Sequence, residues 1–275
     1  MRLLLQFGVV ALVAFAGSAI VGAVQWNVPL TLALGLATAA LSLYAYVQVV
    51  RRTERRAPVE VALRGAGPAF GRGLLIGLGM FAAVILNIAF LGGYEVLGWG
   101  SPAGATALLG FMAAAVVTEE LLFRGILFRI VEQRIGTWAS LALTGVLFGA
   151  AHLFNPHATL WSASAIAVEA GFMLAAAYAA TRNLWVPIGV HFGWNYAQGG
   201  IFSASVSGKD APQGLLDGVT SGPLLLSGGE FGPEASGYSV LAGVAVTAGF
   251  LWLARRRGNL VALPRRSATA ATLAG

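Results

Sequence analysis

Long apolar runs, separated by short polar segments, make up most of this sequence. A helix needs roughly 20 apolar residues to cross about 30 Å of hydrocarbon. Eight runs are candidates for such helices, and they cover residues 3–24, 28–50, 73–98, 103–123, 139–154, 159–181, 185–203 and 237–254. The first run is long for the apolar part of a signal peptide, so we expect it to be retained. The predicted fold is therefore an all-α, polytopic transmembrane bundle of about eight spans.

The composition leads to the same fold class. Hydrophobic residues make up 57% of the 275 residues, charged residues make up 10%, and the mean hydropathy is +0.78. Ordinary soluble domains contain about 25% charged residues. The sequence has no cysteine, which excludes disulfides, thiol nucleophiles and cysteine-bound metals. We expect the lipid bilayer as a partner, and any chemistry must come from carboxylates, histidines and polar neutral side chains.

The basic residues gather where apolar runs end. If Arg2 is cytoplasmic, alternating spans bring most other arginines to the same side: Arg51, Arg52, Arg55, Arg56, Arg64, Arg72, Arg129, Arg134, Arg182, Arg255, Arg256 and Arg257. The loops predicted on the other side, near 25–27, 99–102 and 155–158, contain no lysine or arginine. This distribution follows the positive-inside rule, and Lys209 in the long outer segment is the single exception. Both termini are therefore predicted in the cytoplasm, and the net charge of +6 reflects topology and not nucleic-acid binding.

Residues 1–258 are expected to form a single membrane-embedded domain, with a core at about 103–203. We expect the fourth helix to continue to about Ile135. The segment 204–236 is rich in glycine, serine and proline and is predicted to be one long external loop, either a lid or a linker. Residues 259–275 are predicted to be a disordered cytoplasmic tail.

Two adjacent glutamates and an arginine interrupt the fourth apolar run, in the sequence TEELLFRG at 118–125. A charge at the bilayer centre costs at least about 2.5 to 3.5 kcal/mol on insertion scales, so such residues usually face a cavity or a partner. On a helix Glu120 and Arg124 can pair because they are four residues apart, whereas Glu119 points about 100° away from Glu120. The spacing predicts one neutralised and one free carboxylate. The alternative is a buried ionic cluster of both glutamates with Arg124, and this motif alone does not separate the two.

Two later runs each carry a polar stripe. In FGAAH, His152 follows Phe148 by four residues, and in HFGWN, Asn195 follows His191 by four, so each pair shares one helix face. A single histidine in such a helix is usually a hydrogen-bonded core residue. Polar stripes on three separate membrane helices favour one shared site.

Two further ionisable residues lie close to these motifs. His157 follows Pro156 in a predicted loop, and we expect it to be solvated. Glu169 lies within the sixth run, where it either packs against an arginine or lines a cavity.

A carboxylate, two imidazoles and a carboxamide together suit hydrolysis. Glu119 in a desolvated setting can take a proton from water, and His152 can orient that water. His191 and Asn195 can donate hydrogen bonds to the oxyanion that develops on an attacked carbonyl. A competing arrangement places Zn(II) and its water between Glu119, His152 and His191. The residues alone do not separate these two mechanisms.

The three motifs, in this order, resemble those of the CPBP family of CAAX-prenyl-protease and bacteriocin-processing (Abi) intramembrane proteases. That family shows EExxxR, FxxxH and HxxxN/D, and the match covers about residues 111–200. The resemblance implies that Glu119 is the water-activating base and that His152 assists it. It implies further that His191 and Asn195 hold the oxyanion. The residues expected to shape the site are Glu120, Arg124 and Phe148.

The resemblance also bears on the cofactor. The family carries a metalloprotease label, yet its residue set equally fits a glutamate-dependent protease without metal. We favour the second form and expect no cofactor, with Zn(II) at Glu119, His152 and His191 as the alternative.

Three classes of function fit such a chain. We favour an intramembrane endopeptidase acting on a membrane-associated peptide or protein; the alternatives are a non-catalytic binding or immunity factor of the same family and an ion-coupled transporter. Transporters often contain an internal repeat, and the sequence shows none. All motif positions are intact, which disfavours a loss of catalysis. The abundance of alanine, glycine and arginine is typical of a GC-rich bacterial genome. We therefore expect the protein in the plasma membrane of a bacterium.

Overall fold

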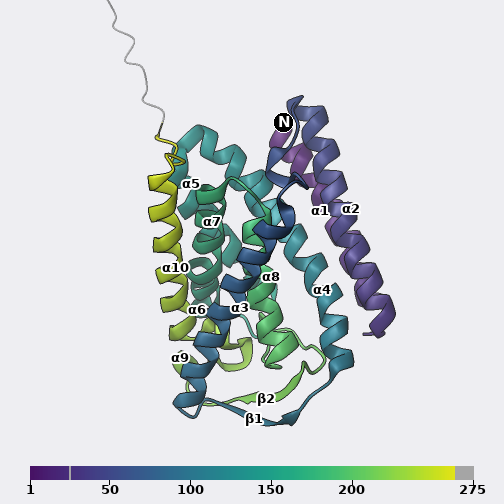
Figure 1. Cartoon of the computed structure of the whole chain (residues 1–275), viewed down its shortest axis with the longest axis vertical. Helices are drawn as coiled ribbons and strands as arrows, with labels where there is room; N and C mark the ends of the chain where they lie inside the picture. The colour runs from purple at the N-terminus through teal and green to yellow at the C-terminus, as the bar shows by residue number, and fades with distance from the viewer. Residues whose placement is uncertain (25, 264–275) are drawn as a thin grey trace, which may run out of the picture.

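The computed structural model describes residues 1–24 and 26–263, and it is a helical bundle with a small sheet at one end (Figure 1). The long helices are α1 (Arg2–Ala23), α2 (Val28–Glu54), α3 (Ala66–Phe90), α4 (Pro102–Glu120), α5 (Arg129–Ala151) and α10 (Gly237–Arg256). The shorter ones are α6 (Leu160–Ile166), α7 (Met173–Thr181), α8 (Trp185–Asn195) and α9 (Leu224–Ser227). The predicted all-α bundle is confirmed.

Three π-helical segments and four 3-10 turns complete the helical part of the described chain. The π segments are η2 (Leu121–Phe128), which joins α4 to α5, η4 (Ala167–Phe172), which joins α6 to α7, and η5 (Tyr196–Ile201), which extends α8. The 3-10 turns are η1 (Val59–Val61), η3 (His152–Phe154), η6 (Gly229–Phe231) and η7 (Pro233–Ala235). Segments of π-helix often occur at functional sites, and here each one adjoins or contains a polar residue of the bundle interior.

Within the described chain, six helical stretches are long and apolar enough to cross a membrane. One of them, Pro102–Phe154, contains two helices, because the backbone breaks at Gly136 with φ 75° and ψ 169°. A positive φ is accessible to glycine at little cost, and the break follows Ile135, where we expected the fourth helix to end. The number of crossings and the side on which the termini lie stay predictions.

Helices α3 and α8 lie side by side in the middle of the bundle (Figure 1). Their contact is made by small residues: a Cβ atom added to Gly77 would lie 2.1 Å from the carbonyl oxygen of Val190, and one added to Gly189 would lie 2.3 Å from that of Phe70. Small residues four apart let membrane helices approach closely. This packing leaves the opposite side of α8 free to present His191 to the interior, because a two-residue offset turns a helix by about 200°.

Polar networks tie the helix ends together at the end of the bundle opposite the sheet. Arg129 donates to Glu54 of α2 from both terminal nitrogens, at 2.9 and 2.8 Å. Arg182 forms an ion pair with Glu132, and Arg2 donates to Gln133. The arginines thus collect at one end of the bundle, which we call the arginine end, whereas β1 (Tyr94–Trp99) and β2 (Leu216–Thr220) pair antiparallel at the other (Figure 1).

This arrangement allows a direct test of the predicted topology, because the chain has no native cysteine. We expect Glu230→Cys, near the sheet end, to react with a membrane-impermeant maleimide in intact cells. Val59→Cys, at the arginine end, should react only after the membrane is permeabilised, because the positive-inside rule places it in the cytoplasm. Both positions are exposed. The reverse labelling pattern would overturn the predicted orientation.

Three sequence predictions need correction. The third span was placed at 73–98, but α3 covers Ala66–Phe90, because Gly92 adopts a φ of 76° and the chain then enters β1. The segment 204–236 is not a plain loop, since it contains β2, α9, η6 and η7. The start of the predicted disordered tail is ordered. The amide of Val261 donates to the hydroxyl of Thr137 at 2.8 Å, and the amide of Thr137 donates to the carbonyl oxygen of Val261 at 2.9 Å. The rest of that tail, 264–275, lies outside the described residues.

Candidate active site

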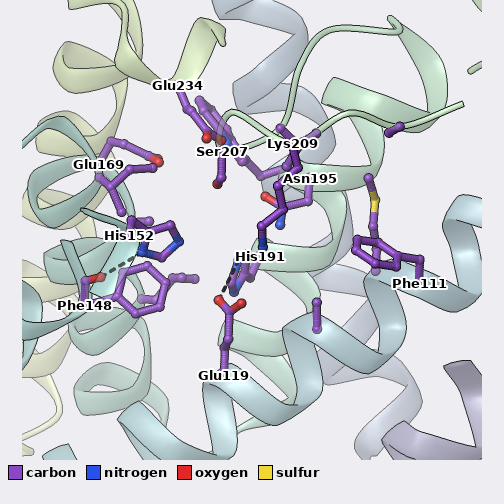
Figure 2. Close-up of a pocket in the computed structure, with 18 of the residues that line it drawn as sticks. Phe111, Glu119, Phe148, His152, Glu169, His191, Asn195, Ser207, Lys209 and Glu234 are labelled. Atoms are coloured by element: carbon purple, nitrogen blue, oxygen red, sulfur yellow. Dashed lines mark hydrogen bonds and ion pairs between the residues drawn. The ribbon is translucent and has the colours of Figure 1, made fainter. Parts of the chain in front are cut away.

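The polar residues of the three motifs meet in one pocket in the bundle interior (Figure 2). Glu119 comes from the end of α4, His152 from η3 at the end of α5, and His191 and Asn195 from α8. The segments that carry them are separated by up to 76 positions in the chain, and the bundle brings them together. Concave sites with a few convergent polar groups are the usual location of binding and catalysis.

Glu120 is buried and accepts hydrogen bonds from two side chains, Arg124 and His191. Its Oε1 atom accepts from Arg124 Nη1 at 2.7 Å and from His191 Nδ1 at 2.8 Å, and its side chain is 0% exposed. Since an ionised carboxylate only accepts hydrogen bonds, the proton in the second contact belongs to Nδ1 of His191. Glu120 therefore orients His191 and leaves Nε2 of that ring facing the pocket.

Arg124 is held on several sides inside the bundle. Besides Glu120, its guanidinium donates to the carbonyl oxygens of Ala170 at 3.1 Å and Gly171 at 3.3 Å, both in the π segment η4. Its Cζ atom lies 4.3 Å from the centre of the Phe148 ring. A cation over an aromatic face is attracted by the ring quadrupole. Arg124 thus connects η2 with α5 and η4 and stabilises the shape of the pocket wall.

Glu119 has a different environment from its neighbour. Its side chain is 31% exposed, it lines the pocket, and its Oε2 atom lies 3.9 Å from His191 Nε2. Among the described residues, the salt bridge of Arg124 involves Glu120 and not Glu119. The two glutamates point in different directions, as their spacing predicted, and the alternative of one ionic cluster is not what the structure shows.

His152 is fixed by the turn that precedes it. Its Nδ1 atom lies 2.8 Å from the carbonyl oxygen of Phe148, and its ring packs 4.8 Å from the Phe148 ring centre. A carbonyl only accepts, so Nδ1 carries the proton and Nε2 is left as an acceptor on the pocket side. Phe148 therefore contacts both His152 and Arg124, and it positions the second motif against the first.

Comparison with known proteins finds relatives of the part of the chain that carries the three motifs. Residues 101–197 match the family described as type II CAAX prenyl endopeptidase Rce1-like. Over 169 residues the chain is 26% identical to a Bacillus subtilis (strain 168) protein named "Putative membrane peptidase YdiL", an alignment that covers 56% of this chain and 67% of that protein. The resemblance to CAAX-type proteases is confirmed. No solved structure matches the chain.

The match to the CAAX endopeptidase family sets the broad class of the chain. It supports a peptidase of the intramembrane type, and the matched residues 101–197 contain all three motifs. Large apolar side chains are exposed on the outer helices, for example Leu12 on α1, Leu41 on α2 and Leu241 on α10. The chain is an integral membrane protein.

Some pocket residues were not found by sequence reasoning. Ser207, Lys209 and Glu234, all from the segment 204–236, line the same pocket as Glu119, and Glu169 does so from η4 (Figure 2). Only Glu169 had been noted in the sequence, as either cavity-lining or packed against an arginine, and it lines the cavity. The segment 204–236 lacks the periodicity that assigns a residue to a helix face, so nothing in it pointed to Glu234.

His157, in contrast, stays outside the pocket. It is exposed, as predicted, and its Nδ1 atom lies 3.1 Å from Glu230 Oε2.

The side chains considered for Zn(II) do not fit a metal centre as they are arranged. The described residues contain no group of three or more histidine, cysteine, aspartate or glutamate side chains placed to hold a metal ion. A catalytic zinc needs three protein ligands around one point. We therefore derive no catalytic step through a metal.

Proposed function

We propose that this protein is an intramembrane endopeptidase that hydrolyses a peptide bond of a membrane-associated substrate with water activated by Glu119. The observation that carries the proposal is the contrast between the adjacent glutamates. Glu120 is fully buried against Arg124 and His191, whereas Glu119 is partly exposed to a pocket that also contains His152 and Asn195. Such a division of roles between two carboxylates is typical of acid and base sites in hydrolases.

The attacking water would lie between Glu119 and His152. Glu119 would accept its proton, and Nε2 of His152, the free acceptor of that ring, would accept a hydrogen bond from the same water. The peptide carbonyl would then receive the hydroxide, and the proton held on Glu119 would pass to the leaving amine. Atoms and charges balance without a covalent enzyme intermediate.

The oxyanion would be held on the α8 side of the pocket. The Asn195 amide is a donor in every state, and it lies four residues after His191 on the same helix face. His191 already donates from Nδ1 to Glu120, so it can donate from Nε2 as well only when the ring is doubly protonated.

The proposal is tested by comparing membrane peptides in bacterial cells that carry either the intact chain or Glu119→Gln. We expect fragments of one or more membrane proteins to accumulate only with the intact chain, because the variant keeps the pocket but lacks the base. Identical peptide sets in both strains would contradict the proposed function and favour a binding or immunity role.

Metal independence is a separate prediction. We expect the purified, active protein to hydrolyse its peptide without stoichiometric metal and to keep its rate after dialysis against a chelator, because the described residues contain no group of three metal-ligating side chains placed to hold an ion. Elemental analysis and a rate before and after chelation would check this. One Zn per chain, with activity lost on chelation and restored by Zn, would overturn it.

A further inference from the structure

Two buried carboxylates outside the three motifs face the pocket. Glu169 of η4 and Glu234 of η7 both line it, and each residue is only 1% exposed. Figure 2 shows their oxygen atoms directed toward the cavity, on the side away from Glu119. The catalytic scheme above uses neither of them.

Each of these carboxylates has an oxygen atom without a partner. Glu169 Oε2 and Glu234 Oε1 are buried and make no hydrogen bond to the described residues. A buried polar atom without a partner costs about 1 to 3 kcal/mol, and more when it is charged. Two such atoms on one pocket wall can each accept a hydrogen bond from a donor that enters the pocket.

The backbones that carry the two carboxylates are held by tight turns and packing. Gly243 of α10 touches Glu169 so closely that an added Cβ atom would lie 2.3 Å from the Glu169 Cα atom. Glu234 lies in the short turn η7, two residues after Gly232, whose φ is 119°. The backbone at both positions therefore belongs to the packed part of the bundle.

Within the part of the chain that the structure describes, no cation forms an ion pair with Glu169 or Glu234. Arg124 is committed to Glu120 and to two carbonyl oxygens. Lys209 is exposed where it lines the pocket, and it makes no ion pair with Glu169 or Glu234 among the described residues. Burial raises the pKa of Glu234 to about 7, although hydrogen bonds from Ser207 and Gln198 act in the opposite direction. Near neutral pH, a cation would readily draw this carboxyl into its ionised form.

We propose that Glu169 and Glu234 form a recognition subsite for an organic cation of the substrate, an ammonium or guanidinium group close to the bond that is cut. That the cation belongs to a substrate rests on the proposed function. The binding of the cation itself does not depend on catalysis. A guanidinium group offers five donors in a planar fork, which matches two carboxylates that each have an oxygen atom without a donor. The subsite gives the peptidase a preference for a lysine, an arginine or a free amino terminus.

The first experiment measures binding alone. The purified full-length protein in detergent is titrated with n-butylguanidinium and with its neutral isostere n-butylurea, and dissociation constants are obtained from the shift in unfolding temperature. We expect the intact protein to bind the cation at least about tenfold more tightly, the effect of one hydrogen bond to a charged group. Glu169→Gln and Glu234→Gln should each remove this difference. Glu230→Gln is the matched control, since Glu230 is 84% exposed, and it should keep the difference.

Equal binding of both probes by the intact protein would overturn the proposal, and this outcome needs no variant to fold. A preference for the cation that persists in both glutamine variants would show that other residues bind it.

The second experiment identifies the source of the cation. The substrates are peptides of about 20 apolar residues with lysine, arginine or norleucine near the centre. Each peptide is made with an acetylated and with a free amino terminus. The values of kcat/KM for these peptides are compared within each protein variant. A ratio of lysine to norleucine cleavage that falls toward one in Glu169→Gln and Glu234→Gln supports a side-chain cation, and a ratio that follows acetylation supports the amino terminus. Cleavage without any such preference would contradict the subsite. Cation binding without any cleavage that depends on Glu119 would instead contradict the proposed function.

Discussion

Glu119→Gln is expected to reduce peptide cleavage by at least about a hundredfold, the lower end of what a general base contributes. The amide keeps the size of the side chain but cannot take a proton from water. Glu119 is 31% exposed and forms no ion pair with Arg124 within the described chain, so its replacement leaves no buried charge without a partner. The unfolding temperature in detergent should therefore change little.

The measurement combines two readouts on one preparation, kcat/KM for a peptide found in the membrane screen and the unfolding temperature of the same sample. Glu95→Gln is a suitable control because Glu95 is exposed on β1, outside the pocket. It should match the intact protein in both readouts. Normal cleavage by Glu119→Gln would remove Glu119 from the role of base, and the hydrolase mechanism would have to be rebuilt.

The sequence was sufficient for features that depend on local spacing. Apolar runs of nearly 20 residues located the helices, because hydrocarbon leaves the backbone no other partner than itself. The four-residue spacing of Glu120 and Arg124 indicated the pair that the structure contains at 2.7 Å. The same rule placed Phe148 with His152, and those rings are 4.8 Å apart.

Features that depend on contacts between distant segments could not be predicted in this way. β1 was taken for the end of a membrane helix, because the apolar character of 94–99 is the same in either conformation. Its partner β2 lies more than a hundred residues later. The role of Glu234 in the pocket likewise depends on how 204–236 folds back over α8, which no periodic pattern within that segment reveals.

The π segments are a further case. The carbonyl oxygens of Ala170 and Gly171 accept from Arg124 because η4 departs from regular α-helical geometry there. An apolar run such as IAVEAGF predicts a helix but not its local widening. The surroundings of Arg124 were therefore only half predictable: Glu120 followed from spacing, whereas the carbonyl oxygens and the face of the Phe148 ring required the tertiary structure.

Glu120→Gln is expected to lose stability as well as activity. The change removes the only carboxylate that pairs with Arg124 in the described chain, and Arg124 is 2% exposed. Breaking a buried ion pair from one side typically costs about 3 to 5 kcal/mol in the free energy of unfolding. Activity should fall too, because Glu120 Oε1 also accepts from His191 Nδ1 and so sets the orientation of that ring.

The double variant Glu120→Gln with Arg124→Gln separates these two effects. It should recover part of the free energy of unfolding, because no buried charge is left without a partner. Recovery should be incomplete, since the carbonyl oxygens of Ala170 and Gly171 lose their donor. Activity should not return, because His191 still lacks the carboxylate that orients it.

These free energies are measured by titrating the single and double variants with denaturant in detergent and monitoring their unfolding. Glu230→Gln provides the control for a solvated pair, because Glu230 contacts only the exposed His157 among the described residues, and such pairs contribute about 0 to 1 kcal/mol. The decisive comparison is between the two adjacent glutamates. If Glu119→Gln were the less stable single variant, or if Glu120→Gln unfolded at the same denaturant concentration as the intact protein, the assignment of catalysis to the first and architecture to the second would be wrong. The base would then have to be sought among the other carboxylates of the pocket, which are Asp210 and the two buried residues on the opposite side, Glu169 and Glu234 (Figure 2).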